Sequence, residues 1–275
     1  MPVISTNTAA NSALRYLNYN SDQQSENLSR IASGSRITKA SDDASGLAIG
    51  TKLQTDVATL TQAQTNAANG ASILSVADGG MASISDILSR MKTLATQSVS
   101  GTVTDTERAY IQAEIDELAL EITSIATATS FNGESLLDGT SDYATGVVFM
   151  AGTESTDTLT VTITDVDATA LAVAALDVET DATTRTAALA AIDAAINTLA
   201  TARAEVGAQM SRFEFRESML ATSLENTDAA ASAIMDADIA SEQAELASNE
   251  VKTQAAIAAL ASANELPQEL LDLLR

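Results

Sequence analysis

Apolar side chains recur at heptad spacing near both ends of this 275-residue chain, although no partner helix stands beside either end in the sequence. Helices with such stripes bury them only against other helices. The ends therefore pair with each other or with the ends of other copies, since a heptad alone does not say which helix is the partner. We predict an assembly seam made of these residues: Ile4, Leu14, Leu17, Leu28, Ile31, Ile234, Leu246, Ile257 and Leu260.

The composition favours long helices over a compact core. Hydrophobic residues make up 45% of the chain, but alanine dominates them and aromatic residues account for only 3%. Alanine is the best helix former and supplies little bulk for a core. Only 2 prolines and 12 glycines interrupt the chain. We expect a thin, helical protein.

The charge of the chain argues against anionic partners. Its formal net charge is -23, which would repel both phosphate backbones and anionic membrane surfaces. We expect neither nucleic-acid nor membrane binding. No lysine or arginine occurs between Arg108 and Arg185, and such a stretch is typical of a solvent-facing outer surface.

Several kinds of site have no residues to build them. The chain has no cysteine and no histidine, which excludes disulfides, thiolates and most zinc and Ser-His sites. An enzyme would have to rely on a carboxylate pair, and the acids fall on polar helix faces. We expect no cofactor, no metal and no catalytic activity. The amino terminus lacks the pattern of a secretory signal, and no apolar run approaches the length of a bilayer span.

The first 140 residues are expected to form helices. The pattern predicts a helix over residues 1–33 with Gly34 as its stop, then a loop carrying Arg36 and Lys39. Ser41 is the expected N-cap of the next helix, with Asp42 and Asp43 in its first turn. That helix is predicted to run unbroken to about residue 98, with a break at Gly79-Gly80 as the alternative.

A second helix should fold back on the first. Thr104 and Glu107 form a capping box before apolar residues at helical spacing. Two short strands follow, residues 146–151 and 158–164, as a hairpin with these candidate residues: Val147, Phe149, Val161 and Ile163. Residues 165–182 have no assignment. From about residue 184 the chain is helical, with a division near 226–228 and an end at Leu266-Pro267.

These elements predict a mainly α fold. Paired amino- and carboxyl-terminal segments form a long coiled-coil-like helical bundle, with a small β-hairpin in the middle of the chain.

Four stretches resemble landmarks of bacterial flagellin: residues 30–50 (RIASGSRITKASDDASGLAIG), 74–80 (LSVADGG), 130–133 (SFNG) and 266–275 (LPQELLDLLR). The resemblance covers roughly residues 1–140 and 185–275. It implies that residues 1–42 and 231–275 form an inner coiled-coil domain lining a narrow channel. Residues 43–140 and 184–230 would form an outer helical domain, and 141–183 a hairpin with a variable solvent-facing segment. The short middle implies that large outer domains are absent.

The resemblance also implies a function. The chain would be a structural subunit that polymerises into the extracellular flagellar filament, the helical propeller for swimming. It would leave the cell unfolded through the flagellar type III route and fold on assembly. Implied partners are further copies of the chain, the cap and hook–filament junction proteins, and an export chaperone at the carboxyl-terminal segment.

Three groups of residues receive roles from the resemblance. An inter-layer loop would touch neighbouring subunits through Arg36, Lys39, Asp42 and Asp43. A receptor footprint for the vertebrate innate receptor, or a contact between protofilaments, would involve Arg90, Leu94 and Glu114. Lys92 and Thr93 depart from the usual charge pattern at that footprint. The hairpin would either take part in filament switching or simply stabilise the fold.

Three other classes of protein are alternatives to flagellin. A hook–filament junction protein shares similar ends and also polymerises. A helical signalling rod would need a membrane segment and a hairpin tip with mirrored heptads, which this sequence lacks. An enzyme would need a pocket that nothing in the sequence indicates.

Overall fold

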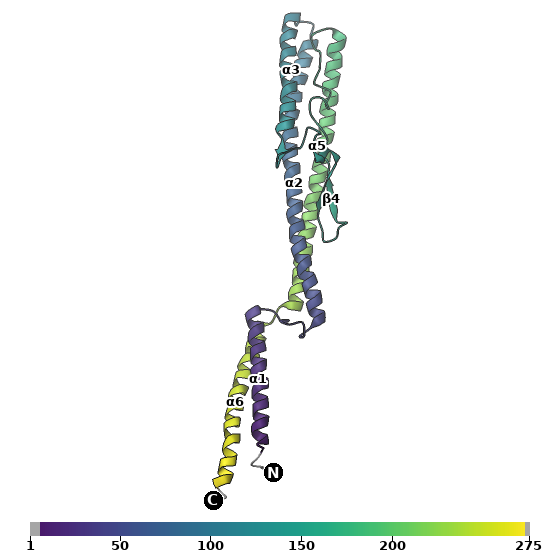
Figure 1. Cartoon of the computed structure of the whole chain (residues 1–275). Coiled ribbons are helices and arrows are strands. Elements are labelled where there is room, and N and C mark those ends of the chain that lie inside the picture. Colours follow the sequence, from purple (N-terminus) through teal and green to yellow (C-terminus); the bar gives the residue numbers. More distant parts are fainter. Residues whose placement is uncertain (1–5, 273–275) are drawn as a thin grey trace. The chain divides into compact units, whose positions relative to one another are not determined.

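A computed structural model describes residues 6–272 and confirms the mainly α fold class (Figure 1). The chain divides into two compact units. Residues 1–57 and 226–275 make up the first, here called the terminal unit, and residues 58–225 make up the second, the central unit. The layer boundaries expected from the resemblance, 42/43 and 230/231, differ from these divisions and stay a prediction about the assembled filament.

The terminal unit pairs the two ends of the chain as antiparallel helices (Figure 1). Helix α1 runs over Thr8–Ser33 and α6 over Ile239–Asp272. The Asn7 side chain, before α1, donates to the Ala263 carbonyl at 2.6 Å, while Arg30 lies 3.4 Å from Glu242. Gly34 ends α1 in the left-handed region at φ 69°, as predicted, because glycine adopts this region without a Cβ penalty.

The start of α2, Ala44–Val99, differs from the prediction. Ser41 does not cap it, and its first turn holds no acid. Instead, Asp43 accepts a hydrogen bond from the Gly46 amide at 2.8 Å. Asp42 accepts from the amides of Thr38 and Lys39, at 3.1 and 3.0 Å. Asp42 thus accepts hydrogen bonds from amides of the loop, and Asp43 accepts one from an amide at the start of α2, where Asp is as favourable an N-cap as Ser.

The predicted continuity of α2 through Gly79 and Gly80 is confirmed. The second glycine has a packing role, because a Cβ at Gly80 would lie 2.5 Å from the Thr129 hydroxyl and 2.8 Å from Leu137. Close approach of neighbouring segments therefore accounts for a residue that is otherwise unfavourable in a helix.

The core of the central unit lies between α2, α3 (Asp105–Ala128) and α5 (Ala182–Met235). The predicted capping box is confirmed: the Thr104 amide donates to Glu107 at 2.7 Å, and the Glu107 amide donates to the Thr104 hydroxyl at 3.4 Å. Large apolar side chains from all three helices are fully buried, among them Leu88, Ile122 and Ile192. Burial of these stripes holds the helices together.

By length and composition alone, one stretch of α2 is apolar enough to cross a membrane. The side chains that raise its hydropathy include Ile73, Leu74, Met81 and Ile84, and these are fully buried in the core of the central unit. Packing in the core explains why these residues are apolar, so the hydropathy of α2 is only weak evidence for a membrane span.

Short strands and one short helix follow α3. Strand β1 (Ser130–Phe131) pairs with β2 (Glu134–Ser135), and α4 covers Asp142–Thr145. The predicted hairpin is confirmed as β3 (Val147–Met150) and β4 (Thr158–Val161), antiparallel with Val147 opposite Val161.

The segment between β4 and α5 is not simply solvent-facing, as its acidity suggested. Its acidic side chains are exposed or half-buried, but its apolar ones enter the core: Val166, Ala168, Leu171, Val173, Leu176 and Val178. The Gln112 side chain binds both sides of this segment, donating to Leu176 at 2.7 Å and accepting from Val178 at 2.8 Å. Helix-like or strand-like periodicity is absent, which is why the sequence left it unassigned.

The carboxyl-terminal helices divide later than predicted. Helix α5 passes through residues 226–228 and ends at Met235, and Asp238 caps α6 by accepting from the amides of Ala240 and Ser241, at 3.0 and 3.2 Å. This Asx cap marks the start of α6. The predicted end at Pro267 is also wrong, because α6 continues to Asp272. A proline removes one amide donor, and here that loss does not end the helix.

Candidate assembly surfaces

The inner faces of α1 and α6 meet in a seam with alternating four- and three-residue spacing. The α1 side comprises Ala13, Leu17, Asn20, Gln24, Asn27 and Ile31. The α6 side comprises Glu242, Leu246, Asn249, Thr253, Ala256, Leu260 and Ala263. Four residues of the predicted assembly seam lie on it, half-buried: Leu17, Ile31, Leu246 and Leu260.

The middle of this seam is polar. Asn27 is only 2% exposed, and among residues 6–272 its side-chain nitrogen has no hydrogen-bond partner. Within the same range, Arg30 Nε and one carboxylate oxygen of Glu242 are buried and unpaired, although these two side chains approach to 3.4 Å. Buried donors without partners cost about 1–3 kcal/mol each. These unpaired groups therefore weaken the pairing of the two helices.

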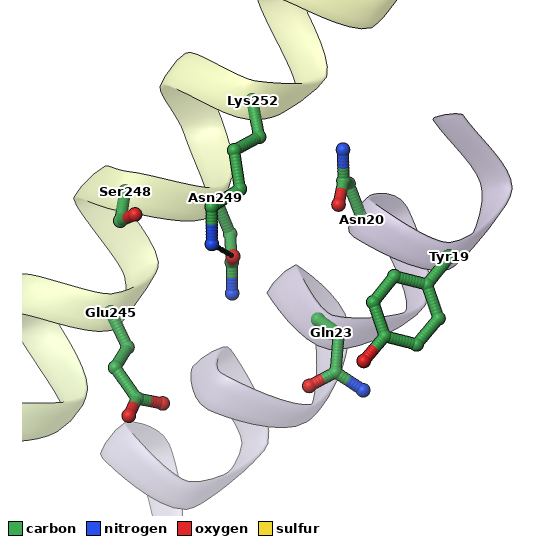
Figure 2. A pocket seen from close by; sticks show the side chains of 7 residues that line it. All are labelled: Tyr19, Asn20, Gln23, Glu245, Ser248, Asn249 and Lys252. Atoms are coloured by element: carbon green, nitrogen blue, oxygen red, sulfur yellow. Dashed lines mark hydrogen bonds between the residues drawn. The ribbon is translucent and has the colours of Figure 1, made fainter. Parts of the chain in front are cut away.

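A polar cleft of about 240 Å³ interrupts the seam between α1 and α6 (Figure 2). Figure 2 shows Tyr19, Asn20 and Gln23 on α1 opposite residues of α6. The one contact drawn among these residues is local to α6, from the Lys252 ammonium to the Asn249 side-chain oxygen at 3.1 Å. Among the described residues that line it, the cleft adds no direct hydrogen bond between the helices.

Large apolar side chains of the pair point away from the seam. The outward apolar residues, as we call them, are Leu14, Leu28, Val251 and Ile257. Leu28 is 58% exposed and Val251 is 66% exposed. Leu14, Leu28 and Ile257, also predicted for the assembly seam, do not lie on the α1–α6 seam, which on α1 uses Ala13 and Asn27, one position earlier. Their place in an assembly of copies stays a prediction. Ile4 lies outside the described residues, and Ile234 is half-buried near the end of α5.

The loop after α1 is joined to the loop before α6 by a group of hydrogen bonds, here called the loop clasp. The Arg36 amide donates to the Met235 carbonyl at 2.7 Å, and the Ala237 amide to the Gly34 carbonyl at 2.9 Å. The Arg36 guanidinium adds bonds to the Ile234 carbonyl at 2.8 and 3.3 Å. Of the predicted loop residues, only Arg36 belongs to this clasp.

The other predicted loop residues act locally. The Lys39 amide, more than any other group, lowers the pKa of the Asp42 carboxyl by hydrogen bonding to it.

Met235 was not predicted from the sequence. It contributes its carbonyl to the loop clasp and packs on α2. A Cβ at Gly50 would lie 2.3 Å from the Met235 sulfur. A glycine inside a helix was therefore the one sequence feature that could have indicated this close contact.

Two of the three predicted receptor-footprint residues are paired on the surface of the central unit. Arg90 and Glu114 form an ion pair at 2.6 Å across α2 and α3, with both side chains about half exposed. Leu94 is only 3% exposed and belongs to the core. Its expected role as a surface contact is therefore corrected, since its place in the helix period turns it inward.

The hairpin residues pack on the central unit. Val161 and Ile163 are fully buried, and Val147 and Phe149 are half-buried. The Phe149 ring meets Phe213 of α5 edge-on, with the ring centroids 5.8 Å apart. This geometry is favourable for aromatic pairs and attaches the hairpin to the helical core.

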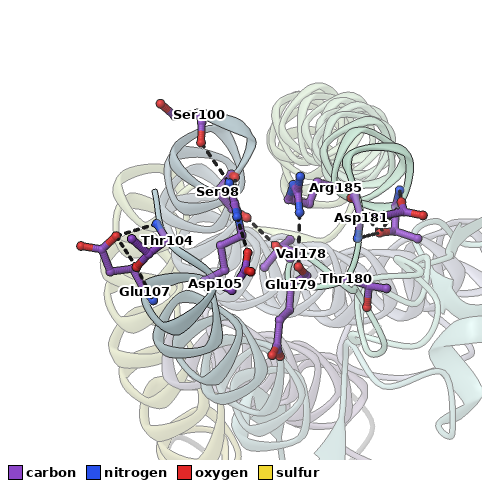
Figure 3. A network of polar contacts seen from close by, with 12 residues as sticks. Ser98, Ser100, Thr104, Asp105, Glu107, Val178, Glu179, Thr180, Asp181 and Arg185 are labelled. Atoms are coloured by element: carbon purple, nitrogen blue, oxygen red, sulfur yellow. Dashed lines mark hydrogen bonds and ion pairs between the residues drawn. The ribbon is translucent and has the colours of Figure 1, made fainter. Parts of the chain in front are cut away.

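A polar network closes the turn between α2 and α3 (Figure 3). The buried Arg108 donates to the carbonyls of Ser98 and Ser100, at 3.1 and 3.2 Å, and to Asp105 at 2.7 Å. The Ser98 hydroxyl in turn donates to the Val178 carbonyl. Arg108 satisfies carbonyls that the end of α2 leaves free. In the sequence, Arg108 is distinguished only as the last basic residue before the acidic stretch.

The fold and these surfaces define a class of protein: a helical chain whose two ends pair with each other and leave large apolar side chains exposed. Residues 4–142 match the bacterial flagellin N-terminal helical region, and residues 189–274 match the bacterial flagellin C-terminal helical region. The chain belongs to the bacterial flagellin family.

Curated relatives extend over the whole chain. The flagellar filament 30.7 kDa core protein of Treponema maltophilum is 34% identical over 283 residues, covering 99% of each chain. The flagellin of Halalkalibacterium halodurans is 36% identical over 275 residues, covering 99% of this chain and 100% of its own. The flagellin of Bacillus subtilis is 36% identical over 302 residues and covers 99% of each chain.

Solved structures agree with the fold. The crystal structure of Bacillus cereus flagellin is 32% identical, with a TM-score of 0.50, over 56% of this chain and 88% of that one. A putative flagellar hook-associated protein from Vibrio parahaemolyticus gives a TM-score of 0.57 at 19% identity, over 70% of this chain and 99% of that one. At that identity the second likeness shows the fold alone, and it gives no support to a junction protein.

The chain is accordingly a structural subunit and not an enzyme. It polymerises with copies of itself into the extracellular flagellar filament.

Proposed function

We propose that the α1–α6 pair forms the inner layer of the filament and that neighbouring copies cover the outward apolar residues. The observation that carries this proposal is that a polar side chain is buried between α1 and α6 while the apolar side chain next to it is exposed: Asn27 is buried and Leu28 is exposed. Apolar patches on a helix pair of this kind favour further helix packing.

The energy available from this burial is modest for each residue and useful in sum. Fully burying a Leu, Ile or Val side chain contributes about 1.5–3 kcal/mol. Because about half of each outward apolar residue is still exposed, each gains roughly 1 kcal/mol when a neighbour covers it. Many such contacts repeated along a helical polymer stabilise an open filament.

The test substitutes Leu14→Ser together with Leu28→Ser in the full chain. We expect the critical concentration for filament growth on seeds to rise at least tenfold, because serine gains nothing from burial. The control is Leu120→Ser, which alters a similarly exposed leucine of the central unit. Equal growth of the double variant and the unaltered chain would refute the inner-layer assignment.

We further infer that the terminal segments are largely unfolded in the free subunit and that the chain leaves the cell through the flagellar type III route. The unpaired groups at Asn27, Arg30 and Glu242 support this, because they weaken the α1–α6 pair in isolation. Neighbours then supply the apolar contacts that make helix formation favourable. Hydrogen exchange should show little protection over residues 8–33 and 239–265 in the monomer and strong protection in filaments.

The carboxyl-terminal segment, residues 231–275, is the proposed binding site for an export chaperone before secretion. An apolar segment that is unfolded inside the cell needs cover against aggregation. Removal of this segment should abolish co-purification with the chaperone, while removal of residues 1–33 should leave it intact.

The cap and hook–filament junction proteins are proposed as the partners at the two ends of the growing filament. Growth on purified hooks should require the junction proteins, and secreted subunits should be lost to the medium without the cap. In the assembled filament, the expected layers are residues 43–140 with 184–230 outside the terminal pair, and Lys39 on the loop touches a neighbouring copy.

The Arg90–Glu114 pair is proposed as a contact between protofilaments that the innate receptor can also reach on free subunits. Both side chains are exposed and fixed by their ion pair at 2.6 Å. Arg90→Ala should reduce activation of receptor-bearing reporter cells by monomer, whereas Lys52→Ala, on an exposed part of α2, should not. A role of the hairpin in filament switching is kept as a proposal, to be tested by the filament waveform of Phe149→Leu.

A further inference from the structure

Helix α1 carries a small exposed patch of aromatic and cationic side chains next to the α1–α6 cleft. This aromatic patch consists of Arg15, Tyr16 and Tyr19. Tyr16 is 60% exposed and Tyr19 is 59% exposed, and the Arg15 guanidinium carbon lies 5.7 Å from the centre of the Tyr16 ring. The whole chain has only 4 tyrosines, and this helix carries Tyr16 and Tyr19.

Tyrosine and arginine are among the residues most enriched where proteins bind each other. Tyrosine buries a large area at a small entropy cost. The seam residues Leu17 and Asn20 turn toward α6, whereas Arg15 and Tyr16 are exposed. Within residues 6–272, the Arg15 guanidinium forms no ion pair with a carboxylate. The patch is thus available to a second molecule.

The positive charge of Arg15 indicates that the aromatic patch binds an acidic surface. Between residues 8 and 20, Arg15 is the only charged side chain. Helix α6 carries six acidic residues and one lysine, hence a formal charge of -5. Beside the seam, at the position after each of four seam residues, α6 presents a stripe at four- and three-residue spacing: Glu250, Gln254, Ile257 and Ala261, all exposed. This outer stripe combines an apolar platform with one carboxylate at its start.

We propose that the aromatic patch of one copy docks on the outer stripe of α6 in a second copy. The Tyr16 and Tyr19 rings cover Ile257, and the Arg15 guanidinium pairs with the Glu250 carboxylate. The contact deepens the proposed inner layer and rests on it. Because it joins two different faces, α1 of one copy to α6 of the next, it repeats without closing, as a filament requires.

A contact of α1 with α1 fits the charges less well. It would bring two Arg15 guanidinium groups together in a two-fold arrangement, and like charges at an interface disfavour binding. A two-fold contact would also close on itself and stop growth.

Photo-crosslinking in assembled filaments tests the proposal. The full chain carries p-benzoylphenylalanine in place of Tyr16 and is mixed with nitrogen-15-labelled unaltered chain before assembly, so that crosslinks between copies are recognised by mass. We expect the crosslinked peptides to come from residues 239–265 of the labelled copy. The same replacement at Tyr110, which is 72% exposed on α3, is the control and should not reach these residues.

Crosslinks from position 16 to α1 or to the central unit of another copy would overturn the proposal. If they still form in normal filaments through residues 8–33, the inner-layer assignment survives while the docking mode fails. If neither terminal helix is reached in filaments, both fail.

A charge exchange keeps the proposal open to refutation if the bulky probe prevents assembly. Arg15→Glu should slow filament growth at least tenfold, and adding Glu250→Arg to the same chain should restore it to within about threefold. Arg15→Glu combined with Lys252→Glu is the control without a restored pair and should not recover. Growth unaffected by Arg15→Glu, or no rescue by Glu250→Arg, would overturn the pairing.

Discussion

Replacing the buried amide of Asn27 by an apolar group should strengthen the α1–α6 pair in the free subunit. Asn27 is 2% exposed in the seam, and its side-chain nitrogen lacks a partner among the described residues. The substitution Asn27→Leu removes this unpaired donor and adds apolar surface at a position that heptad packing favours.

The expected gain follows from three terms. Removing the unpaired buried donor relieves about 1–3 kcal/mol. Burying a leucine contributes about 1.5–3 kcal/mol. Imperfect fit of the larger side chain costs about 1–3 kcal/mol. The net stabilisation of the pair is about 2 kcal/mol, equivalent to a roughly thirtyfold shift of the closing equilibrium.

Hydrogen–deuterium exchange on the monomer measures this directly. Amides of α1 and α6 should exchange more slowly in Asn27→Leu than in the unaltered chain, by at most about thirtyfold. Asn18→Leu makes the same chemical change at an exposed position of the same helix and should alter exchange by less than about twofold.

A pair that closes too early should also hinder export. We therefore expect Asn27→Leu, but not Asn18→Leu, to lower the amount of subunit secreted per cell. Exchange that is unchanged or faster in Asn27→Leu would show that the Asn27 amide is not a desolvated, unpaired group. The explanation of the weak seam would then be wrong.

Three further substitutions probe the central unit. Thr104→Ala removes the capping box of α3 and should lower the free energy of unfolding by about 1 kcal/mol in urea titrations. Gly70→Ala places a Cβ 2.5 Å from the Phe213 ring and should cost about 1–3 kcal/mol through overpacking, seen as a lower melting temperature. Burial is the first cause that raises the pKa of the Asp165 carboxyl, so the native state binds its proton more tightly than the unfolded chain does. That contribution to stability is present below the unfolded pKa near 3.8 and is lost as pH rises through the folded value. Asp165→Asn should therefore stabilise the unit at pH 7 and change little at pH 3, and an equal effect at both would contradict the pKa direction.

Local chemistry made much of the fold predictable. Gly34, the capping box of Thr104 and the alternation after Thr158 each act on their own neighbours, and each element they predicted is present. The end of α5 was missed because it depends on a partner distant in sequence, the loop near Arg36, which binds the Met235 carbonyl.

The assembly surfaces were harder to predict than the elements. A heptad stripe located the seam to within one position, but Leu28 and Asn27 are adjacent, and the periodicity of α1 does not say which of them faces α6. An apolar scale favours Leu28 inward. The structure places Leu28 outward, which agrees with the proposal that other copies cover it. For Leu94, the helix period was available and indicates burial, but the family resemblance placed it on the surface.

The loop clasp bears on how mechanical load passes through the chain. Rotation of a propeller applies torque to every subunit, and a single flexible linker would let one terminal helix slide or twist independently of the other. Main-chain bonds from Arg36 to Met235 and from Ala237 to Gly34 tie the two linkers together at the point where α1 ends and α6 begins. A force on either terminal helix is therefore transmitted to the other through these bonds, so the two helices move together at this end although their seam contains unpaired polar groups.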